Sequence, residues 1–261
     1  MSDDLDALRG ALLRWYAHSR RDLPWRRTTD PYAILVSEVM LQQTQVARVV
    51  PRYLEWLERW PTAGALAAAS RGEVLAAWVG LGYNRRALAL HAAAVVVARQ
   101  GWPADLRSLP GVGPYTAAAV ASFAFGAQVA AVDTNVRRVA ERLGHGTPAD
   151  LLPTGRAAEW NQAAMELGAT VCTARTPRCG ECPAAAWCAS AGRPALARGA
   201  PRRAAERFED TNRWVRGRVV AALAAGEGLP ADIAPERLDR AVTGLVHDGL
   251  VRRVEGGLAL G

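Results

Sequence analysis

Apolar residues recur at helical spacing along most of this chain. Leu5, Leu8 and Leu12 fall on one face of a helix, and Leu54 and Leu57 on one face of another. Alternating strand patterns are nearly absent before residue 245, and short breaks at glycine and proline separate the helical segments. The pattern predicts a compact all-α domain with short connections between its helices.

The end of the chain follows a different pattern. Residues 191–210 lack periodicity and contain proline, glycine and arginine, which predicts a linker. Helix-like segments at 211–225 and 235–249 precede two apolar pieces around Gly256-Gly257, which is the signal of a hairpin. We therefore expect a small winged-helix-like module at 211–261. The alternative is a helical appendage that packs on the main domain.

The basic residues limit the chemistry that the chain can perform. The chain has 32 basic and 25 acidic residues and a formal net charge of +7, which favours a polyanionic partner such as nucleic acid. A basic protein without such a partner is the alternative. All 32 basic residues are arginine. No lysine is therefore available as a Schiff-base nucleophile, as a general base or as the phosphate ligand of a Walker loop.

We predict neither a signal peptide nor a membrane span. The N-terminus is acidic and has no apolar run behind it. The longest apolar stretch, 117–132, is interrupted by Ser122, Gly126 and Gln128 and is shorter than the ~20 residues that cross a bilayer. We expect this stretch to form a buried helix in a cytoplasmic protein.

All four cysteines lie in one short segment. Cys172, Cys179, Cys182 and Cys188 are separated by six, two and five residues. In a cytosolic protein such a group indicates metal binding before disulfides. Zinc prefers pairs of ligands with ~2–4 residues inside each pair, and only the middle pair has that spacing. The spacing therefore favours a [4Fe-4S] cluster, with zinc and free thiols as the alternatives.

A glycine-rich turn follows Leu109. Gly111 and Gly113 permit positive φ and close backbone approach, between a helix expected to end near Leu109 and another expected to begin near Pro114. Amide groups at such a helix N-terminus form an anion site. The pattern is that of a helix-hairpin-helix motif. Such a motif binds DNA phosphates and does not recognise the base sequence. The residues that would bind the phosphate here are Gly111, Val112 and Gly113. An ordinary turn between helices is the alternative.

A further helix begins at Asp30 and Pro31, as N-cap and first-turn residue. Ile34, Glu38 and Leu41 then share one face of this helix at positions i, i+4 and i+7. A carboxyl group on an apolar face is expected to have a raised pKa, which suits a general acid. A surface or salt-bridged glutamate is the alternative.

Two other segments place polar groups near the ends of expected helices. Asp133 lies where a helix begins, so it is either an ordinary N-cap or a functional carboxylate. Arg137 and Arg138 follow it and either reach phosphates or are solvated. Gln42 and Gln43 begin an amide-rich stretch that is typical of a base-contacting loop or of a solvated turn.

Together these features resemble the helix-hairpin-helix DNA glycosylases, and more narrowly the MutY-type adenine DNA glycosylases. The resemblance covers residues 10–190 and depends on motifs that match the family in order and spacing. These motifs are Leu23-Pro24-Trp25-Arg26, Ser37–Gln45, Gly80-Leu81-Gly82-Tyr83, Leu109–Thr116, and Met165-Glu166-Leu167-Gly168 followed by Cys172.

The resemblance implies two helical lobes that flank a DNA groove. We expect residues 1–24 and 136–190 to form the iron–sulfur cluster lobe, and residues 25–135 to form a six-helix lobe that contains the hairpin. The implied partner is double-stranded DNA with a mispaired or damaged base pair, bound by a monomer associated with the bacterial nucleoid. The target base is implied to flip into a pocket between the lobes.

The resemblance also implies the reaction, which is hydrolysis of the N-glycosidic bond of adenine mispaired with 8-oxoguanine or guanine in base excision repair. Glu38 is implied to protonate the adenine, and Asp133 to stabilise the oxocarbenium-like sugar. Glycoside hydrolases use a similar pair of carboxyl groups, of which one is protonated and acts as the acid while the other is ionised. The implied supporting residues of the pocket are Arg26, Tyr115, Asn135 and Glu166.

Further residues acquire roles from the resemblance alone. Gln43 and Tyr83 are implied to enter the base stack, next to Gln42. The cluster held by the four cysteines is implied to shape a basic loop that includes Arg175 and Arg178, without taking part in base removal. Relatives that also cut the DNA strand carry a lysine at the position of Tyr115. We therefore expect a monofunctional glycosylase that leaves an abasic site, unlike endonuclease III.

Two departures from the family pattern define the alternatives. The family has Asp-Gly-Asn where this chain has Asp133-Thr134-Asn135, and some thymine-mismatch glycosylases also carry a residue other than glycine there. A thymine or uracil mismatch glycosylase is thus the nearest alternative, followed by a non-catalytic iron–sulfur DNA-binding protein. Many family members also end in a MutT-like domain that recognises 8-oxoguanine, whereas here only 211–261 follow the linker. That module offers a substitute DNA contact through Arg213, Arg216, Arg218, Arg252 and Arg253.

Overall fold

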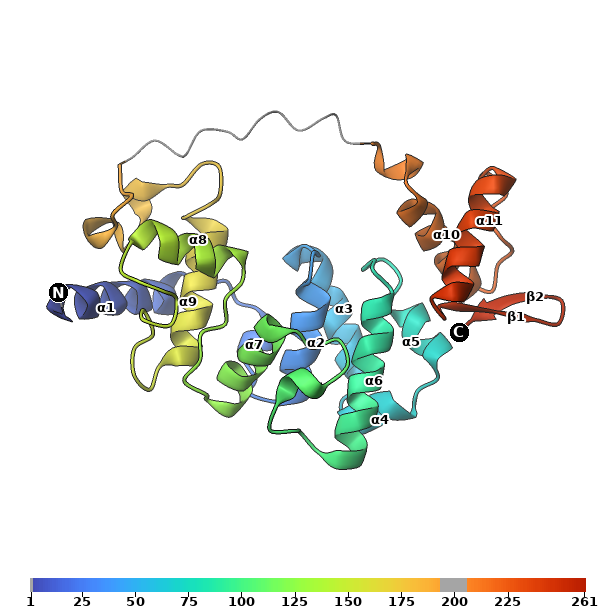
Figure 1. Ribbon diagram of the computed structural model, residues 1–261, viewed down its shortest axis with the longest axis horizontal. Coiled ribbons are helices and arrows are strands. Elements are labelled where there is room, and N and C mark those ends of the chain that lie inside the picture. The colour runs from blue at the N-terminus through green and yellow to red at the C-terminus, as the bar shows by residue number, and fades with distance from the viewer. Residues whose placement is uncertain (1, 193–205) are drawn as a thin grey trace. The chain divides into compact units, whose positions relative to one another are not determined.

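The computed structural model describes residues 2–192 and 206–261, which form eleven α-helices and one two-stranded sheet (Figure 1). The helices are α1 Ser2–Ser19, α2 Pro31–Leu41, α3 Val46–Arg59, α4 Ala63–Ala68, α5 Arg71–Ala77, α6 Arg85–Gln100, α7 Pro114–Phe125, α8 Thr134–Leu143, α9 Ala157–Thr170, α10 Asn212–Ala224 and α11 Pro235–His247. Strands β1 Val251–Val254 and β2 Gly257–Leu260 pair antiparallel, with Val251 opposite Leu260. The predicted helical body and the predicted C-terminal hairpin are both confirmed.

The described residues fall into two compact units. Unit 1 comprises residues 2–35 and 112–192, and unit 2 comprises residues 36–111 and 206–261. Helix α2 passes from one unit to the other after Leu35. The division into lobes at 1–24 with 136–190 and at 25–135 stays a prediction.

The predicted linker is described only at its ends. Residues 193–205 of the 191–210 segment lie outside the described residues. Phe208–Asp210, at the end of this segment, forms a 3-10 turn before α10.

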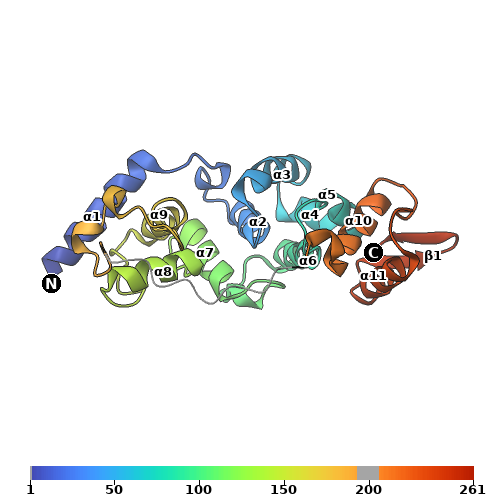
Figure 2. The same cartoon turned by 90° about the horizontal axis from the view of Figure 1, so that it is seen from above.

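The core of unit 1 forms where α1 and α8 both pack on α9 (Figure 2). Leu8, Leu12 and Tyr16 recur every fourth residue on α1 and are almost fully buried. They belong to one apolar cluster with Trp160 of α9. Burial of each such side chain contributes about 1.5–3 kcal/mol, so this face of α1 fixes the helix on the unit.

Glycine allows α8 and α9 to approach closely. A Cβ atom at Gly168 would lie 2.6 Å from the Cβ of Asn135, which is closer than two carbon atoms can come without displacement. Because Gly168 has no side chain, the first turn of α8 can lie directly against α9. This contact positions the Asp133–Asn135 segment.

Three tryptophans hold the centre of unit 2. Trp56 contacts Trp60 and Trp78 edge to face, with ring centroids 4.8 and 5.4 Å apart, a geometry that aromatic pairs favour. Helix α4 packs on α6 beside them.

The C-terminal module belongs to unit 2. Helix α10 and strand β2 pack against α5, and Arg71 Nη2 donates a hydrogen bond to the Gly249 carbonyl oxygen at 2.8 Å. The module also has a small core of its own, around Val215, Ile233 and Ala241. The winged-helix-like arrangement of two helices and a hairpin is therefore docked on the main helical part of this unit.

Two local expectations need correction. The apolar stretch 117–132 is not one helix, because α7 ends at Phe125 and Gly126 turns the chain with a left-handed φ of +66°. The element that ends near Leu109 is only a 3-10 turn, Leu106–Ser108. Nowhere in the described ranges does a helix combine the length and the apolar character that a bilayer crossing needs.

Candidate active site and DNA interface

Helix α2 places Glu38 in a buried position. Its N-cap is Asp30, whose two carboxylate oxygens accept hydrogen bonds from the backbone N–H of Tyr32 at 3.2 Å and of Ala33 at 3.1 Å. The Glu38 side chain follows two turns later. Glu38 is 6% exposed and Ile34, one turn before it, is 1% exposed. A carboxyl group thus lies in an apolar helix, as the sequence pattern predicts.

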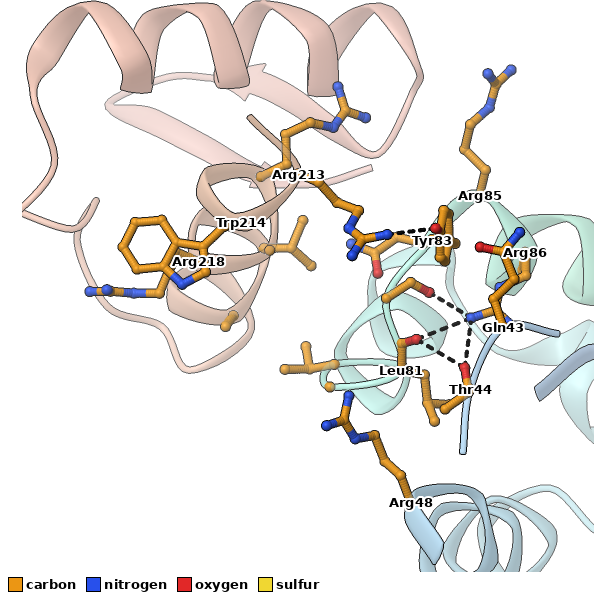
Figure 3. Close-up of a pocket in the computed structure, with 18 of the residues that line it drawn as sticks. Gln43, Thr44, Arg48, Leu81, Tyr83, Arg85, Arg86, Arg213, Trp214 and Arg218 are labelled. Carbon is orange, nitrogen blue, oxygen red and sulfur yellow. Dashed lines mark hydrogen bonds between the residues drawn. The ribbon is translucent and has the colours of Figure 1, made fainter. Parts of the chain in front are cut away.

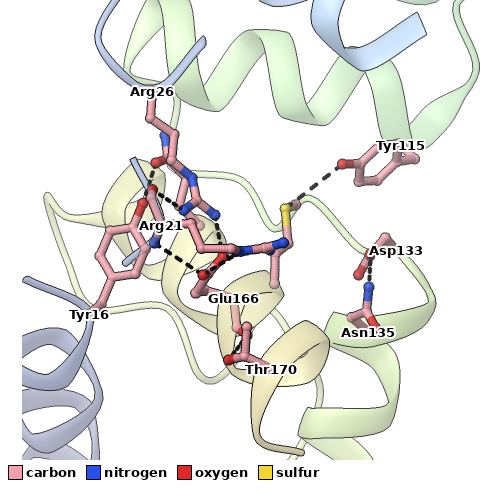
Figure 4. Close-up of polar contacts among 10 residues, drawn as sticks. Tyr16, Arg21, Arg26, Tyr115, Asp133, Asn135, Glu166 and Thr170 are labelled. Atoms are coloured by element: carbon pink, nitrogen blue, oxygen red, sulfur yellow. Dashed lines mark hydrogen bonds and ion pairs between the residues drawn. The ribbon is translucent and has the colours of Figure 1, made fainter. Parts of the chain in front are cut away.

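Asp133 is the N-cap of α8. Its Oδ1 accepts a hydrogen bond from Val136 N–H at 2.7 Å, and its Oδ2 accepts one from Asn135 Nδ2 at 2.8 Å (Figure 4). The side chain is half-buried. Because both oxygens are bonded, the carboxylate is fixed in one orientation and not free to rotate.

Arg138 holds Asn135, the hydrogen-bond partner of Asp133, in place. Its Nη2 donates to Asn135 Oδ1 and to the Gly168 carbonyl oxygen, both at 2.7 Å. Its Nε donates to the carbonyl oxygen of Cys172 at 3.0 Å. A continuous chain of hydrogen bonds therefore runs from the start of the cysteine segment through Arg138 and Asn135 to Asp133.

Glu166 of α9 is the centre of a buried charge cluster (Figure 4). Its Oε1 accepts a hydrogen bond from Arg21 Nε at 2.8 Å and its Oε2 accepts one from Arg26 Nη2 at 2.7 Å. Burial by itself raises the pKa of a carboxyl group, but the two guanidinium groups outweigh it and lower the pKa of Glu166 to about 2. Glu166 thus stays ionised and anchors the segment that precedes α2.

Tyr115 lies in the first turn of α7. Its hydroxyl group contacts the Met165 sulfur at 3.8 Å, next to Glu166 in the sequence of α9. A phenol at this position is a weak nucleophile compared with the amine that a lysine would provide.

The hairpin before α7 has two glycines with different constraints. Gly111 has φ +75°, and a Cβ there would lie 2.6 Å from the Cβ of Ala89 on α6. Gly113, the N-cap of α7, has φ −84° and an open surrounding. Gly111 and Gly113 are exposed while Val112 between them is buried. The turn therefore presents backbone at a helix N-terminus, where anions bind favourably.

Gln43 and Tyr83 adopt backbone conformations that are rare for residues with side chains. Their φ values are +55° and +49°, a left-handed region that costs on the order of 1–3 kcal/mol. Gln43 and Tyr83 are both exposed, while the neighbouring Gln42 is half-buried.

Arg86 holds both of the loops that carry these residues (Figure 3). Its guanidinium group donates to the carbonyl oxygens of Val39 at 2.7 Å, in the last turn of α2, and of Gln42 at 2.6 Å, in the loop that follows. It also donates to the carbonyl oxygens of Leu81 at 3.1 Å and Gly82 at 3.0 Å on the other loop. Burial lowers the pKa of Arg86. These bonds keep Gln43 and Tyr83 in place.

The four cysteines follow α9 in a loop stabilised by short 3-10 turns. All four side chains are half-buried and no disulfide joins them. Burial raises the pKa of the Cys182 thiol, and the nearby Cys172, Cys188 and Cys179 add to that effect. In the described part of the chain no three potential ligands are arranged for a single metal ion.

The donor set of the cysteine loop nevertheless fits a cluster. Cys172, Cys179 and Cys188 lie close enough to Cys182 to act on its thiol, and Arg142 Nη1 donates to the Cys172 sulfur at 3.3 Å. Hydrogen bonds to the sulfur atoms are a common feature of such cluster sites. Cluster irons are held by thiolates of this kind.

Some of the predicted site residues contact one another in the structure, and further residues contact them. Arg26 meets Glu166, and Asn135 meets Asp133. Sequence reasoning missed Arg21 and Arg86, and left Arg138 open between phosphate binding and solvation. No local pattern marks the first two, because Glu166 lies 145 residues from Arg21, and the Gln42 and Val39 carbonyl oxygens lie 44 and 47 residues from Arg86.

The helical fold with its hairpin is that of a base excision DNA repair protein. Residues 36–155 match the family described as HhH-GPD superfamily base excision DNA repair protein. A thermostable thymine-DNA glycosylase has a similar structure, with a TM-score of 0.66 at 29% identity over 72% of this chain and 96% of that one. An endonuclease III trapped on DNA has the same fold, with a TM-score of 0.62 at 23% identity over 73% of this chain and 97% of the other.

A narrower assignment follows from a relative in Mycolicibacterium smegmatis. This relative is named adenine DNA glycosylase and is 48% identical, over 94% of this chain and 93% of its own length. The chain belongs to the adenine DNA glycosylase family, and the predicted helix-hairpin-helix glycosylase fold is confirmed.

Proposed function

We propose that this chain removes adenine from double-stranded DNA where the adenine is mispaired with 8-oxoguanine or guanine. The observation that carries the proposal is the 48% identity with an adenine DNA glycosylase over nearly the whole chain. The reaction is hydrolysis of the N-glycosidic bond in base excision repair. The enzyme acts as a monomer in the cytoplasm, on DNA of the nucleoid.

Two carboxyl groups divide the chemistry. Glu38, buried in α2, donates a proton to the adenine, so that the base leaves as a neutral molecule when the bond to the sugar breaks. Asp133, oriented by Val136 and Asn135, stabilises the positive charge that develops on the sugar. Water then supplies the hydroxyl group of the product.

The enzyme is monofunctional. Tyr115 stands where strand-cutting relatives have lysine, and the chain has no lysine at all. Without an amine nucleophile no Schiff base with the opened sugar forms, so the product is an intact strand with an abasic site.

The hairpin and the glutamine–tyrosine loops bind the DNA. Gly111, Val112 and Gly113 grip a phosphate, and Gln42, Gln43 and Tyr83 contact the base stack. Arg26 and Glu166 support the pocket by anchoring the segment before α2.

Cys172, Cys179, Cys182 and Cys188 hold a [4Fe-4S] cluster. The four cysteines would hold this group beside the basic residues Arg175 and Arg178, where it would support the loop and supply no redox chemistry to base removal. Absorbance near 400 nm together with iron and sulfide analysis tests the assignment, and one zinc per chain without visible absorbance would contradict it.

A single-turnover assay tests the function. Duplexes containing A:8-oxoguanine, A:G, T:G or U:G are incubated with excess enzyme and analysed with and without alkali. We expect loss of adenine and strand breaks only after alkali. Strand breaks without alkali would contradict the monofunctional reading.

Thymine or uracil removal is the second candidate function. Two observations support thymine or uracil removal. They are the likeness to a thymine-DNA glycosylase at 29% identity and the residue Thr134 within the Asp-x-Asn motif. Excision from the T:G or U:G duplex, with A:G and A:8-oxoguanine left intact, would establish it in place of adenine removal.

A further inference from the structure

A large cavity lies in unit 2, between two loops and the C-terminal module (Figure 3). Residues 42–45 and 79–86 form one wall, and α10 with Phe208 and Leu250 forms the other. Its volume is about 1050 Å³, at the upper end of the range for small-molecule sites, ~300–1,000 Å³. Glu38 does not line it, so it is distinct from the proposed position of the acid.

The lining of this cavity is strongly basic. Six of the lining residues are arginines and none is acidic. The arginines are Arg48, Arg85, Arg86, Arg213, Arg216 and Arg218. A cavity with this charge concentrates anions.

The six arginines are not equivalent. Arg216 pairs with Asp248 at 2.6 Å and Arg218 with Asp232 at 2.8 Å, while Arg85 lies 3.8 Å from Asp248 and Arg86 is bound to carbonyl oxygens. Arg48 and Arg213 have no carboxylate partner within the ranges that the structure describes. Arg86 likewise lacks a carboxylate among the described residues, but its guanidinium group is held by backbone carbonyl oxygens. Arg48 and Arg213 are therefore the cavity arginines that neither a carboxylate nor a backbone carbonyl oxygen holds in the described ranges.

Exposed aromatic rings flank Arg213. Its guanidinium carbon lies 5.0 Å from the ring centres of Tyr83 and of Phe208, and its Nη1 donates to Tyr83 Oη at 2.5 Å. Tyr83 is 42% exposed and Phe208 is 49% exposed. Arg86 also lies over the Tyr83 ring, with its guanidinium carbon 5.5 Å from the ring centre. Arginines together with exposed aromatic rings are the combination with which proteins bind single-stranded nucleic acid, through phosphates and stacked bases together.

We propose that this cavity binds one strand of the DNA, with an unstacked nucleotide against Tyr83 and Phe208 and the adjoining phosphates on Arg48 and Arg213. The C-terminal module then completes a DNA site that the main helical part forms only in part. The inference rests on the proposed function, because it takes the bound polymer to be the DNA substrate. Of the arginines that the sequence suggested as DNA contacts in the module, Arg213 lines the cavity. Arg252 and Arg253 lie on β1 and do not line it.

The test uses the full chain and two probes, a duplex with an A:G mispair and a single-stranded oligodeoxynucleotide. Binding is measured by fluorescence anisotropy over a series of salt concentrations for Arg48→Ala, Arg213→Ala and Arg213→Lys. Arg99→Ala is the matched control, because Arg99 is an exposed arginine of the same unit outside the cavity. Thermal unfolding of each variant is recorded in parallel.

We expect Arg48→Ala and Arg213→Ala each to weaken binding of both probes about tenfold and to lower the salt slope by about 1. Arg213→Lys should keep the slope of the wild type, and Arg99→Ala should keep both affinity and slope. Tyr83→Leu should weaken binding about tenfold with little change in slope, since stacking carries no counterion release.

Two results would overturn the inference. In the first, Arg48→Ala and Arg213→Ala bind both probes with wild-type affinity and slope. In the second, Arg213→Ala lowers thermal stability but not the slope, so that Arg213 only fastens the module. Adenine excision by the wild-type protein is measured in the same preparation. If that protein removes no adenine, the proposed function fails; if it removes adenine while the variants bind normally, only the cavity assignment fails.

Discussion

The two units hold their buried ionised groups in different ways. In unit 1, Glu166 is paired with two opposite charges, Arg21 and Arg26. In unit 2, Arg86 is bound by neutral oxygen atoms and has no carboxylate partner among the described residues. The first arrangement depends on the protonation state of a carboxyl group, whereas the second does not. The ion pairs of Glu166 are thus sensitive to acid, whereas the hydrogen bonds of Arg86 depend only on the positions of the carbonyl oxygens around it.

The two carboxyl groups of the proposed reaction also differ in their surroundings. Asp133 of unit 1 is held by N–H donors, while Glu38 of unit 2 lies in an apolar helix. Similar side chains are therefore expected to serve opposite purposes, one as a charge and one as a proton donor.

The largest effect is expected from removing these two functions. Asp133→Asn keeps a good N-cap but loses the charge, and Glu38→Gln loses the proton. Each should lower the single-turnover rate about 10²–10⁴-fold while DNA affinity is retained. Rates are measured with excess enzyme. Full activity of Asp133→Asn would show that the aspartate serves only as an N-cap.

The next effect concerns the loops of unit 2. Arg86→Ala removes the hydrogen-bond donor of several carbonyl oxygens around the two loops. Each carbonyl oxygen that is left unpaired lowers the free energy of unfolding by about 1–3 kcal/mol. We expect a loss of about 4 kcal/mol in the free energy of unfolding by urea. Arg99→Ala, an exposed arginine at the end of α6, should change it by less than about 0.5 kcal/mol. An Arg86→Ala variant as stable as wild type would show that water replaces the guanidinium.

A somewhat smaller effect depends on pH in unit 1. The pKa of Glu166 is about 2 in the folded chain, below its ordinary value of 4.5. Its contribution is therefore complete above pH 4.5 and is lost as the pH falls toward 2. The shift corresponds to about 3 kcal/mol.

Urea unfolding of wild type and Glu166→Gln, at pH 7 and pH 3, measures this contribution. We expect the difference between the two proteins to shrink at the lower pH. The difference between wild type and Arg86→Ala should stay constant, because no carboxylate is involved. A pH-independent effect of Glu166→Gln would contradict the assigned pKa.

The smallest effect distinguishes the two glycines of the hairpin. Gly111→Ala forces a side chain into a left-handed conformation and against Ala89, so it should cost about 2 kcal/mol. Gly113→Ala meets open space at an ordinary φ and should leave stability nearly unchanged. Thermal unfolding checks both. Equal destabilisation would mean that the turn, not the contact with α6, sets the requirement for glycine.

Much of the fold was predictable because its signals are local. The N-caps Asp30 and Asp133 are recognised within one turn of the helices that they begin, and the Gly256-Gly257 turn places its own hairpin. The burial of Glu38 follows from its spacing to Ile34 on the same helix. The end of α7 was misplaced because an apolar run continues past Gly126, whose left-handed φ ends the helix.

The sequence by itself determined where α2 and α8 begin, which face of α1 is apolar, and which residues we propose for the chemistry of the family. The tertiary structure alone decided how the arginines are used. Arg21 meets Glu166 across 145 residues, Arg86 joins two loops, and Arg48 and Arg213 face one cavity while their neighbours are paired. The physical reason is that helix caps and periodicity act between neighbours in the chain, whereas the partner of a long, flexible guanidinium depends on which distant segments the packed core brings within its reach.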